Sequence, residues 1–205
     1  MKKDIILAGV GGQGILTIAA SIGLAALEEN LELKQAEVHG MSQRGGAVQS
    51  HLRISDKDIA SDLIPLGKAD LVLSVEPLES LRYLPYLCPD GWLVTNSTPF
   101  VNIPDYPEME DIRREIQKIQ HHLIVDADRI SKDIGSTRSS NIVMLGAASS
   151  FIGLETSLFE AGIDRIFRGK GEAVVRMNIR AFQAGREYVE MKLSGKSKSY
   201  NNSAG

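Results

Sequence analysis

The sequence of 205 residues contains a single cysteine, Cys88. One thiol excludes an internal disulfide, and it excludes every iron–sulfur or zinc site that needs several cysteines from one chain. The net charge is −3 and the isoelectric point is about 5.8, so no basic field attracts nucleic acid or an anionic membrane surface. We therefore expect no metal site in this chain and no nucleic-acid partner.

Long apolar runs are also absent. No run reaches the roughly 18–20 residues that a membrane-spanning helix requires. The first residues, Met1 to Asp4, lead directly into a strand-like segment and do not have the pattern of a signal peptide. These features predict a cytoplasmic protein with no membrane partner.

The sequence lacks the short motifs of several large enzyme classes. It contains no G-x-S-x-G, no H-E-x-x-H and no phosphate-loop lysine. It also lacks a G-D-G motif with downstream asparagines, the usual metal site for thiamine diphosphate. A chain with a phosphate-loop-like turn but no set of catalytic residues is more typical of one part of an enzyme than of a complete one.

The hydrophobic content is 43%, enough to form a substantial core, and apolar periodicity predicts alternating strands and helices. Strands are expected at 5–8, 33–38, 47–54, 71–75, 92–95 and 123–125, and helices at 15–29, 78–87, 110–119, 141–152, 157–167 and 172–193. This order predicts a Rossmann-like, doubly wound α/β fold with a mainly parallel sheet and C-terminal helices. We expect one domain over residues 1–193 and a disordered tail rich in Ser, Asn, Gly and Lys over 194–205.

A glycine-rich turn follows the first predicted strand and has the pattern G-x-G-x-x-G. Its glycines are Gly9, Gly11, Gly12 and Gly14. At a strand-to-helix junction, such glycines let the backbone approach a phosphate at the helix N-terminus. Glu37 lies about 20 residues further on, where a dinucleotide site has its acidic ribose partner. The alternative is that the glycines serve only to let the strand and helix pack closely.

A second unusual segment has the sequence E-V-H-G-M-S-Q-R-G-G over residues 37–46. Its polar and glycine residues predict a loop that contacts a ligand, a cofactor or another subunit. The forked guanidinium of Arg44 favours an anion or carboxylate. The candidate contact residues are Glu37, His39, Ser42, Gln43 and Arg44. His51 and Arg53, on the polar face of the next strand, are expected to extend this surface. The alternative is that Arg44 only braces its own loop.

Together, the two motifs resemble the gamma-type subunit, or domain, of 2-oxoacid:ferredoxin oxidoreductases. The similarity continues through A-D-L-V-L at 69–73 and E-P at 76–77, and it covers about residues 3–190. The segment R-Y-L-P-Y-L at 82–87, followed by Asn96 and by I-P at 103–104, is most similar to the small beta subunit of the indolepyruvate enzymes.

The resemblance implies a subunit that is inactive alone. Enzymes of this family decarboxylate a 2-oxoacid oxidatively on thiamine diphosphate, pass electrons through iron–sulfur clusters to ferredoxin and release an acyl-CoA. The resemblance places the thiamine diphosphate and the clusters in a partner alpha-type catalytic subunit, with ferredoxin reached through the complex. It makes coenzyme A a cosubstrate that the gamma module helps to accommodate, and no cofactor is expected in this chain alone.

Two other functional classes are consistent with parts of the sequence. A free-standing nucleotide-binding or sensor protein would use the turn at 9–14 without a catalytic partner. An NAD-dependent dehydrogenase would use the same turn, but the sequence offers no convincing acid–base pair for it. A nucleotide affinity of the isolated chain would favour the first of these, whereas a neighbouring gene with thiamine and cysteine-cluster motifs would favour the subunit.

Overall fold

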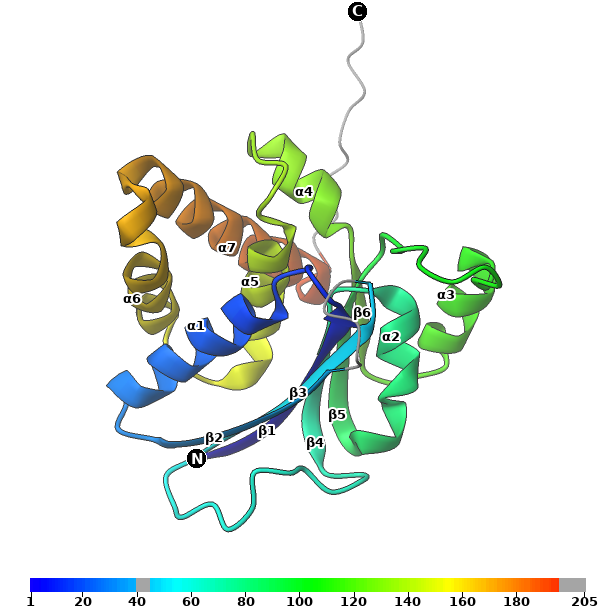
Figure 1. Ribbon diagram of the computed structural model, residues 1–205, viewed down its shortest axis with the longest axis horizontal. Coiled ribbons are helices and arrows are strands. Elements are labelled where there is room, and N and C mark those ends of the chain that lie inside the picture. Colours follow the sequence, from blue (N-terminus) through cyan, green and yellow to red (C-terminus); the bar gives the residue numbers. More distant parts are fainter. Residues whose placement is uncertain (40–44, 196–205) are drawn as a thin grey trace, which may run out of the picture.

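The computed structural model of the chain describes residues 1–39 and 45–195. A six-stranded sheet lies at its centre, with strand order β2-β3-β1-β4-β5-β6 (Figure 1). The strands are β1 (Lys2–Val10), β2 (Glu32–His39), β3 (Ala47–Ser55), β4 (Ala69–Ser74), β5 (Leu87–Asn96) and β6 (His122–Val125). Strands β1, β4, β5 and β6 pair in parallel, whereas β3 runs antiparallel to both β1 and β2.

Helices cover both faces of the sheet, which gives three layers (Figure 1). The helices are α1 (Ile15–Glu28), α2 (Pro77–Arg82), α3 (Met109–Gln117), α4 (Ala127–Asp133), α5 (Ser140–Ile152), α6 (Thr156–Phe167) and α7 (Glu172–Leu193), with short 3-10 helices η1 (Leu84–Tyr86) and η2 (Arg168–Lys170). Helices α1, α5, α6 and α7 pack on one face, and α2 and α3 pack on the other. No helix among the described residues is long and apolar enough to cross a membrane.

Two hydrophobic cores lie on opposite faces of β1. Ile5 and Leu7 belong to the larger core, against α1, α5, α6 and α7, whereas Ile6 and Ala8 belong to the smaller core, against α2 and α3. All four side chains are at most 1% exposed. A strand covered on both faces needs a continuous apolar run, and this requirement explains the sequence of β1.

The predicted α/β fold class is confirmed, with differences in detail. The sheet is mixed, because β3 is inserted in antiparallel orientation between β2 and β1. The helix expected over 78–87 is wrong in extent: α2 ends at Arg82, and Leu87 already belongs to β5. Helix α4 was missed, since its seven residues are too few to show a clear apolar period. Most of the tail expected to be disordered lies outside the described residues.

Helices α5 and α7 cross at two glycines. A β-carbon placed on Gly146 of α5 would lie 1.9 Å from the backbone oxygen of Phe182 in α7, and one placed on Gly185 of α7 would lie 2.0 Å from the backbone oxygen of Val143. No real β-carbon approaches a backbone atom so closely. The two helix backbones are therefore in contact, and any side chain at these positions would force them apart.

We predict that Gly146→Ala lowers the free energy of unfolding by about 3 kcal/mol or more, because the backbone of α7 cannot yield as a flexible side chain would. For a domain of this size, this corresponds to a fall in melting temperature of roughly 6–12 °C. Gly169→Ala is the matched control, since nothing lies within 4 Å of its added β-carbon. A melting temperature equal in the two variants would contradict the close crossing.

Candidate functional site

The two sequence motifs meet at the edge of the sheet where the parallel strands end. The N–H of Gly11 donates to the carbonyl oxygen of Gly46 at 2.9 Å, and the N–H of Gly45 donates to the carbonyl oxygen of Gly11 at 3.4 Å. These bonds continue the ladder between β1 and β3, in which Val10 lies opposite Ala47. The sheet register therefore places the glycine-rich turn and the end of the second motif side by side.

The four motif glycines have different roles, and the interpretation of Gly9 as part of the turn is wrong. Gly9 lies within β1, opposite Val48, and a β-carbon there would meet Cγ2 of Val75 at 2.4 Å. Gly12 and Gly14 have φ angles of +103° and +81°, which side chains rarely adopt. The turn thus begins at Gly11, and Gly9 is a packing glycine.

The side chain of Asn141 reaches the turn from α5. Its Nδ2 donates to the carbonyl oxygen of Gly14, the N-cap of α1, at 3.3 Å. A β-carbon on Gly14 would lie 2.4 Å from the same Nδ2. The absence of a side chain at Gly14 thus has a structural cause within the chain. The N-cap of α5 itself is Ser139, without a side-chain capping bond.

The candidate contact residues lie along β2 and beyond it. Glu37 is half-buried in β2 opposite Ser50, and its Oε1 accepts a hydrogen bond from Nε2 of Gln35 at 2.7 Å. Strand β3 separates β2 from β1, so Glu37 does not lie on the strand beside the glycine turn, as the ribose-binding acid of a dinucleotide fold does.

Much of the second motif itself is not described. His39 ends β2 opposite Val48, but its side chain lies outside the description. Ser42, Gln43 and Arg44 also lie outside the described residues. Their assignment as contact residues therefore stays a prediction.

His51 and Arg53 do not extend this surface. His51 is 2% exposed, and its Nδ1 accepts the N–H of Ile64 at 3.0 Å. Burial, followed by the charge of Arg53, lowers the pKa of His51 below its ordinary value of 6.5. The expected polar face of β3 is therefore covered by the segment that follows the strand.

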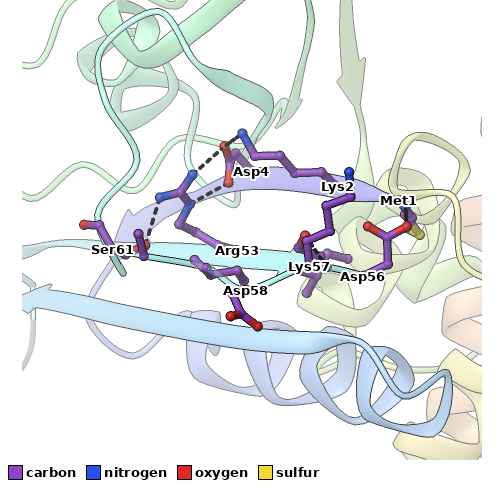
Figure 2. Close-up of a pocket in the computed structure, with 12 residues that line it drawn as sticks. Met1, Lys2, Asp4, Arg53, Asp56, Lys57, Asp58 and Ser61 are labelled. Carbon is purple, nitrogen blue, oxygen red and sulfur yellow. Dashed lines mark hydrogen bonds and ion pairs between the residues drawn. The ribbon is translucent and has the colours of Figure 1, made fainter.

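Arg53 lies in an open pocket toward the opposite edge of the sheet (Figure 2). Its guanidinium donates two hydrogen bonds to the buried carboxylate of Asp4, from Nε to Oδ1 at 2.7 Å and from Nη2 to Oδ2 at 3.1 Å. It also donates to the carbonyl oxygens of Ser61 and Leu63. Because most of its N–H donors are engaged within the chain, this arginine connects the segment after β3 to β1.

A buried carboxylate, Glu76, organises the edge where the motifs meet. Glu76 is 1% exposed and is the N-cap of α2, directly after β4. Its Oε2 accepts the N–H of Glu79 at 2.7 Å, while its Oε1 accepts the N–H of Phe100 at 3.2 Å and the hydroxyl of Tyr106. Three donors thus satisfy one carboxylate, and two of them belong to residues 97–108, a segment that we call the strap.

The strap also touches the second motif. Nδ2 of Asn102 donates to the carbonyl oxygen of Gly45 at 2.7 Å. These hydrogen bonds join four parts into one connected surface: the turn that begins at Gly11, the pair Gly45–Gly46, the start of α5, and the strap. We call this surface the carboxyl edge. From the sequence alone, residues 96–107, which hold three of the seven prolines, are predicted to form an excursion loop. The one available signal was Glu76 followed by Pro77, an acidic N-cap before proline at the first helical position.

The described part of the carboxyl edge contains backbone and side-chain hydrogen-bonding groups around one buried carboxylate. Among the described residues, no group of three or more His, Cys, Asp or Glu is placed to hold a metal ion. Burial raises the pKa of Glu79, and the charge of Arg82 opposes that shift. Burial and the hydrogen bond to Glu76 raise the pKa of Tyr106, so the phenol stays protonated as a donor.

We predict that Tyr106→Phe lowers the free energy of unfolding at pH 8 by about 1–3 kcal/mol, because Glu76 loses a donor while staying buried. The raised pKa of Tyr106 contributes stability below its ordinary pKa of 10.0 that is lost as the pH rises above that value. The variant should therefore lose less stability than the parent between pH 8 and 11 in urea titrations. Tyr188→Phe is the control at pH 8, since its hydroxyl donates to the neutral carbonyl oxygen of Ile124. It does not serve for the pH dependence, because burial raises the pKa of Tyr188 as well. Equal losses of unfolding free energy in the two variants at pH 8 would contradict a special role for Tyr106.

Comparison with solved structures finds the same fold in related enzymes. The gamma subunit of a keto/oxoacid ferredoxin oxidoreductase from Geobacter sulfurreducens is 25% identical and superposes with a TM-score of 0.68, covering 92% of this chain and 98% of that one. The 2-oxoglutarate:ferredoxin oxidoreductase from Magnetococcus marinus is 20% identical, with a TM-score of 0.73. The match covers 97% of this chain but 32% of the longer one.

The sequence comparisons agree with the structural ones. Indolepyruvate oxidoreductase subunit IorB from Pyrococcus horikoshii is 37% identical over 194 residues, which cover 90% of this chain and 95% of that protein. The family model for pyruvate ferredoxin/flavodoxin oxidoreductase matches residues 4–188, nearly the whole described chain. With the fold and the sequence in agreement over this length, the chain belongs to the pyruvate ferredoxin/flavodoxin oxidoreductase family.

Proposed function

We propose that this chain is a non-autonomous subunit of an indolepyruvate-type or arylpyruvate-type 2-oxoacid ferredoxin oxidoreductase, which oxidatively decarboxylates a 2-oxoacid to an acyl-CoA. The observation that carries the proposal is the match to the IorB subunit over 95% of that protein's length. The relative is one subunit of an enzyme, and the similarity extends over nearly all of it.

The residues present do not fit the redox groups of such an enzyme. One cysteine cannot ligate an iron–sulfur cluster, and the described residues offer no cluster of ligands for the metal of thiamine diphosphate. We therefore assign both groups to an alpha-type catalytic subunit, through which ferredoxin is reduced. The match to one third of the longer 2-oxoglutarate enzyme supports this assignment, because the same fold occurs there as one part of a larger chain.

Within the complex, we assign to the carboxyl edge the contact with the catalytic subunit and with coenzyme A. In open α/β sheets, ligands bind outside the carboxyl ends of the strands, and both motifs lie at this end. The proposed contact residues are Glu37, His39, Ser42, Gln43 and Arg44. Arg44 would meet a carboxylate or a phosphate there.

A free-standing nucleotide-binding role is less well supported. Gly14 already accommodates the side chain of Asn141, and Glu37 does not lie on the strand next to the glycine turn. Both features that suggested a dinucleotide site therefore have other structural explanations. The subunit assignment accounts for the whole chain, whereas the nucleotide assignment concerns only residues 9–14.

We predict that the purified chain is colourless, binds no thiamine diphosphate and turns over no 2-oxoacid. Activity should appear when it is mixed with the catalytic subunit from the same organism, in an assay with indolepyruvate, coenzyme A and a ferredoxin or dye acceptor. Turnover by the lone chain, or an iron–sulfur absorption band in it, would overturn the proposal. A nucleotide affinity in the micromolar range without any effect of the catalytic subunit would favour the rival class.

A second prediction concerns Arg44. Arg44→Ala should leave the isolated chain as stable as the parent but weaken assembly or raise KM for the oxoacid or coenzyme A, because a desolvated charge-assisted contact is typically worth about 2–5 kcal/mol. Arg165→Ala, which removes an exposed charge from α6, is the matched control. If Arg44→Ala instead destabilises the lone chain while the complex keeps normal kinetics, Arg44 only braces its own loop.

A further inference from the structure

The strap presents an apolar surface to solvent. Phe100, Val101 and Ile103 are 43%, 67% and 42% exposed. They lie within a run from Trp92 to Pro104 that contains no charged residue, although 24% of the chain is charged. Clustered apolar side chains without charges are typical of the centre of a protein–protein interface rather than of free surface.

The strap has a defined shape although it contains no helix or strand. Glu76, buried after β4, accepts hydrogen bonds from Phe100 and Tyr106, and Asn102 donates to Gly45. These hydrogen bonds hold the strap at the first exposed apolar residue, among the exposed residues, and just beyond them. A loop that served only as a connection would not need a buried carboxylate to fix its path, because solvent can satisfy its backbone groups.

The strap is continuous with the surface already assigned to the catalytic subunit. The bond from Asn102 to Gly45 places it next to the end of the second motif. In Figure 1 the strap is the green segment that leads into α3, at the end of the sheet where β1, β4 and β5 finish. A partner that contacts the second motif would therefore reach the strap without a gap.

We propose that the strap docks into an apolar depression on the thiamine-diphosphate-binding catalytic subunit, with Val101 at the centre of the contact and Phe100 and Ile103 beside it. The inference rests on the proposed function and adds to it the surface and the chemistry of the contact. Glu76 acts here as a positioning residue, since it holds the strap in shape and does not touch the partner.

A second copy of this chain fits the strap less well. A head-to-tail contact needs a receiving apolar hollow, whereas the open pocket beside Arg53 has charged side chains at half of its lining positions, among them Asp4, Arg53 and Lys57 (Figure 2). A two-fold contact would need a self-complementary patch around the strap, and the sedimentation experiment described below tests this alternative. The catalytic subunit is therefore the occupant that we propose.

The test uses Val101→Asp and a matched control. Leu66→Asp introduces the same charge at a site with nearly equal exposure, 65% against 67%, in the segment between β3 and β4 at the opposite end of the sheet. Binding to the immobilised catalytic subunit from the same organism is measured by interferometry. Val101→Asp should weaken binding at least about 30-fold, as expected for the loss of an interface hot spot, while Leu66→Asp should change it by less than about 3-fold.

The outcomes separate the two proposals. If the parent chain does not bind the catalytic subunit at all, the proposed function and this inference both fail. If the parent binds and Val101→Asp binds equally well, only the docking surface is wrong. If the parent self-associates in sedimentation experiments and Val101→Asp abolishes this without affecting the catalytic subunit, the occupant is a second copy and the inference is overturned.

Two further measurements exclude a trivial loss of folding. Melting temperatures of Val101→Asp and the parent should agree, because the side chain is mostly exposed. If the aspartate variant does not fold, Val101→Ser takes its place, with weaker binding expected in the same direction. Glu76→Gln should weaken binding through the strap and also lower the melting temperature, and a fall in stability with unchanged binding would remove Glu76 from the inference.

Discussion

The antiparallel pairing of β3 with β1 is the constraint on which the carboxyl edge depends. Its register pairs Ile5 with Leu52, and both side chains belong to the larger core. A slip by one residue would turn the apolar side chains of β3 to the wrong face, so the core fixes the register. Because Val10 then lies opposite Ala47, the residues just beyond them, Gly11 and Gly46, must meet. The position of the site is thus set by packing in the middle of the sheet.

Glu76 adds a second constraint that the sheet alone does not provide. A parallel strand ends at Ser74, and the chain beyond it must start α2 and also lie under the strap. One carboxylate satisfies both needs, since one oxygen caps the helix and the other accepts from Phe100 and Tyr106. A desolvated carboxylate is tolerated only when its oxygens are well satisfied. The helix and the strap therefore depend on the same group.

Periodicity was enough to predict the fold class and most elements, because buried parallel strands and amphipathic helices have local signatures. It could not show that β3 lies between β2 and β1, because strand order is a property of the whole core. The error at Gly9 has the same origin: its neighbour Val75 is far away in sequence. The polar alternation of β3 was real, but it suggested an exposed face, since the residues after β3 that cover His51 have no local signal.

The site was only partly predictable for a related reason. The two glycine motifs could be recognised from their sequence patterns. Asn102, Tyr106 and Asn141 belong to no such pattern, because their roles arise from tertiary contacts. The prolines of the strap predicted only an excursion loop, because proline content and lack of periodicity are typical of any loop. Only the structure shows that a buried carboxylate holds it.

A fixed strap has a consequence for assembly. Ordering one residue of flexible backbone costs roughly 1–2 kcal/mol, and a loop that became ordered only on docking would lose that free energy from its affinity. The bonds to Glu76 and Gly45 order the strap during folding, when the cooperative packing of the sheet offsets the cost. In the proposed docking, a surface ordered before contact lets a small apolar area support a specific interface.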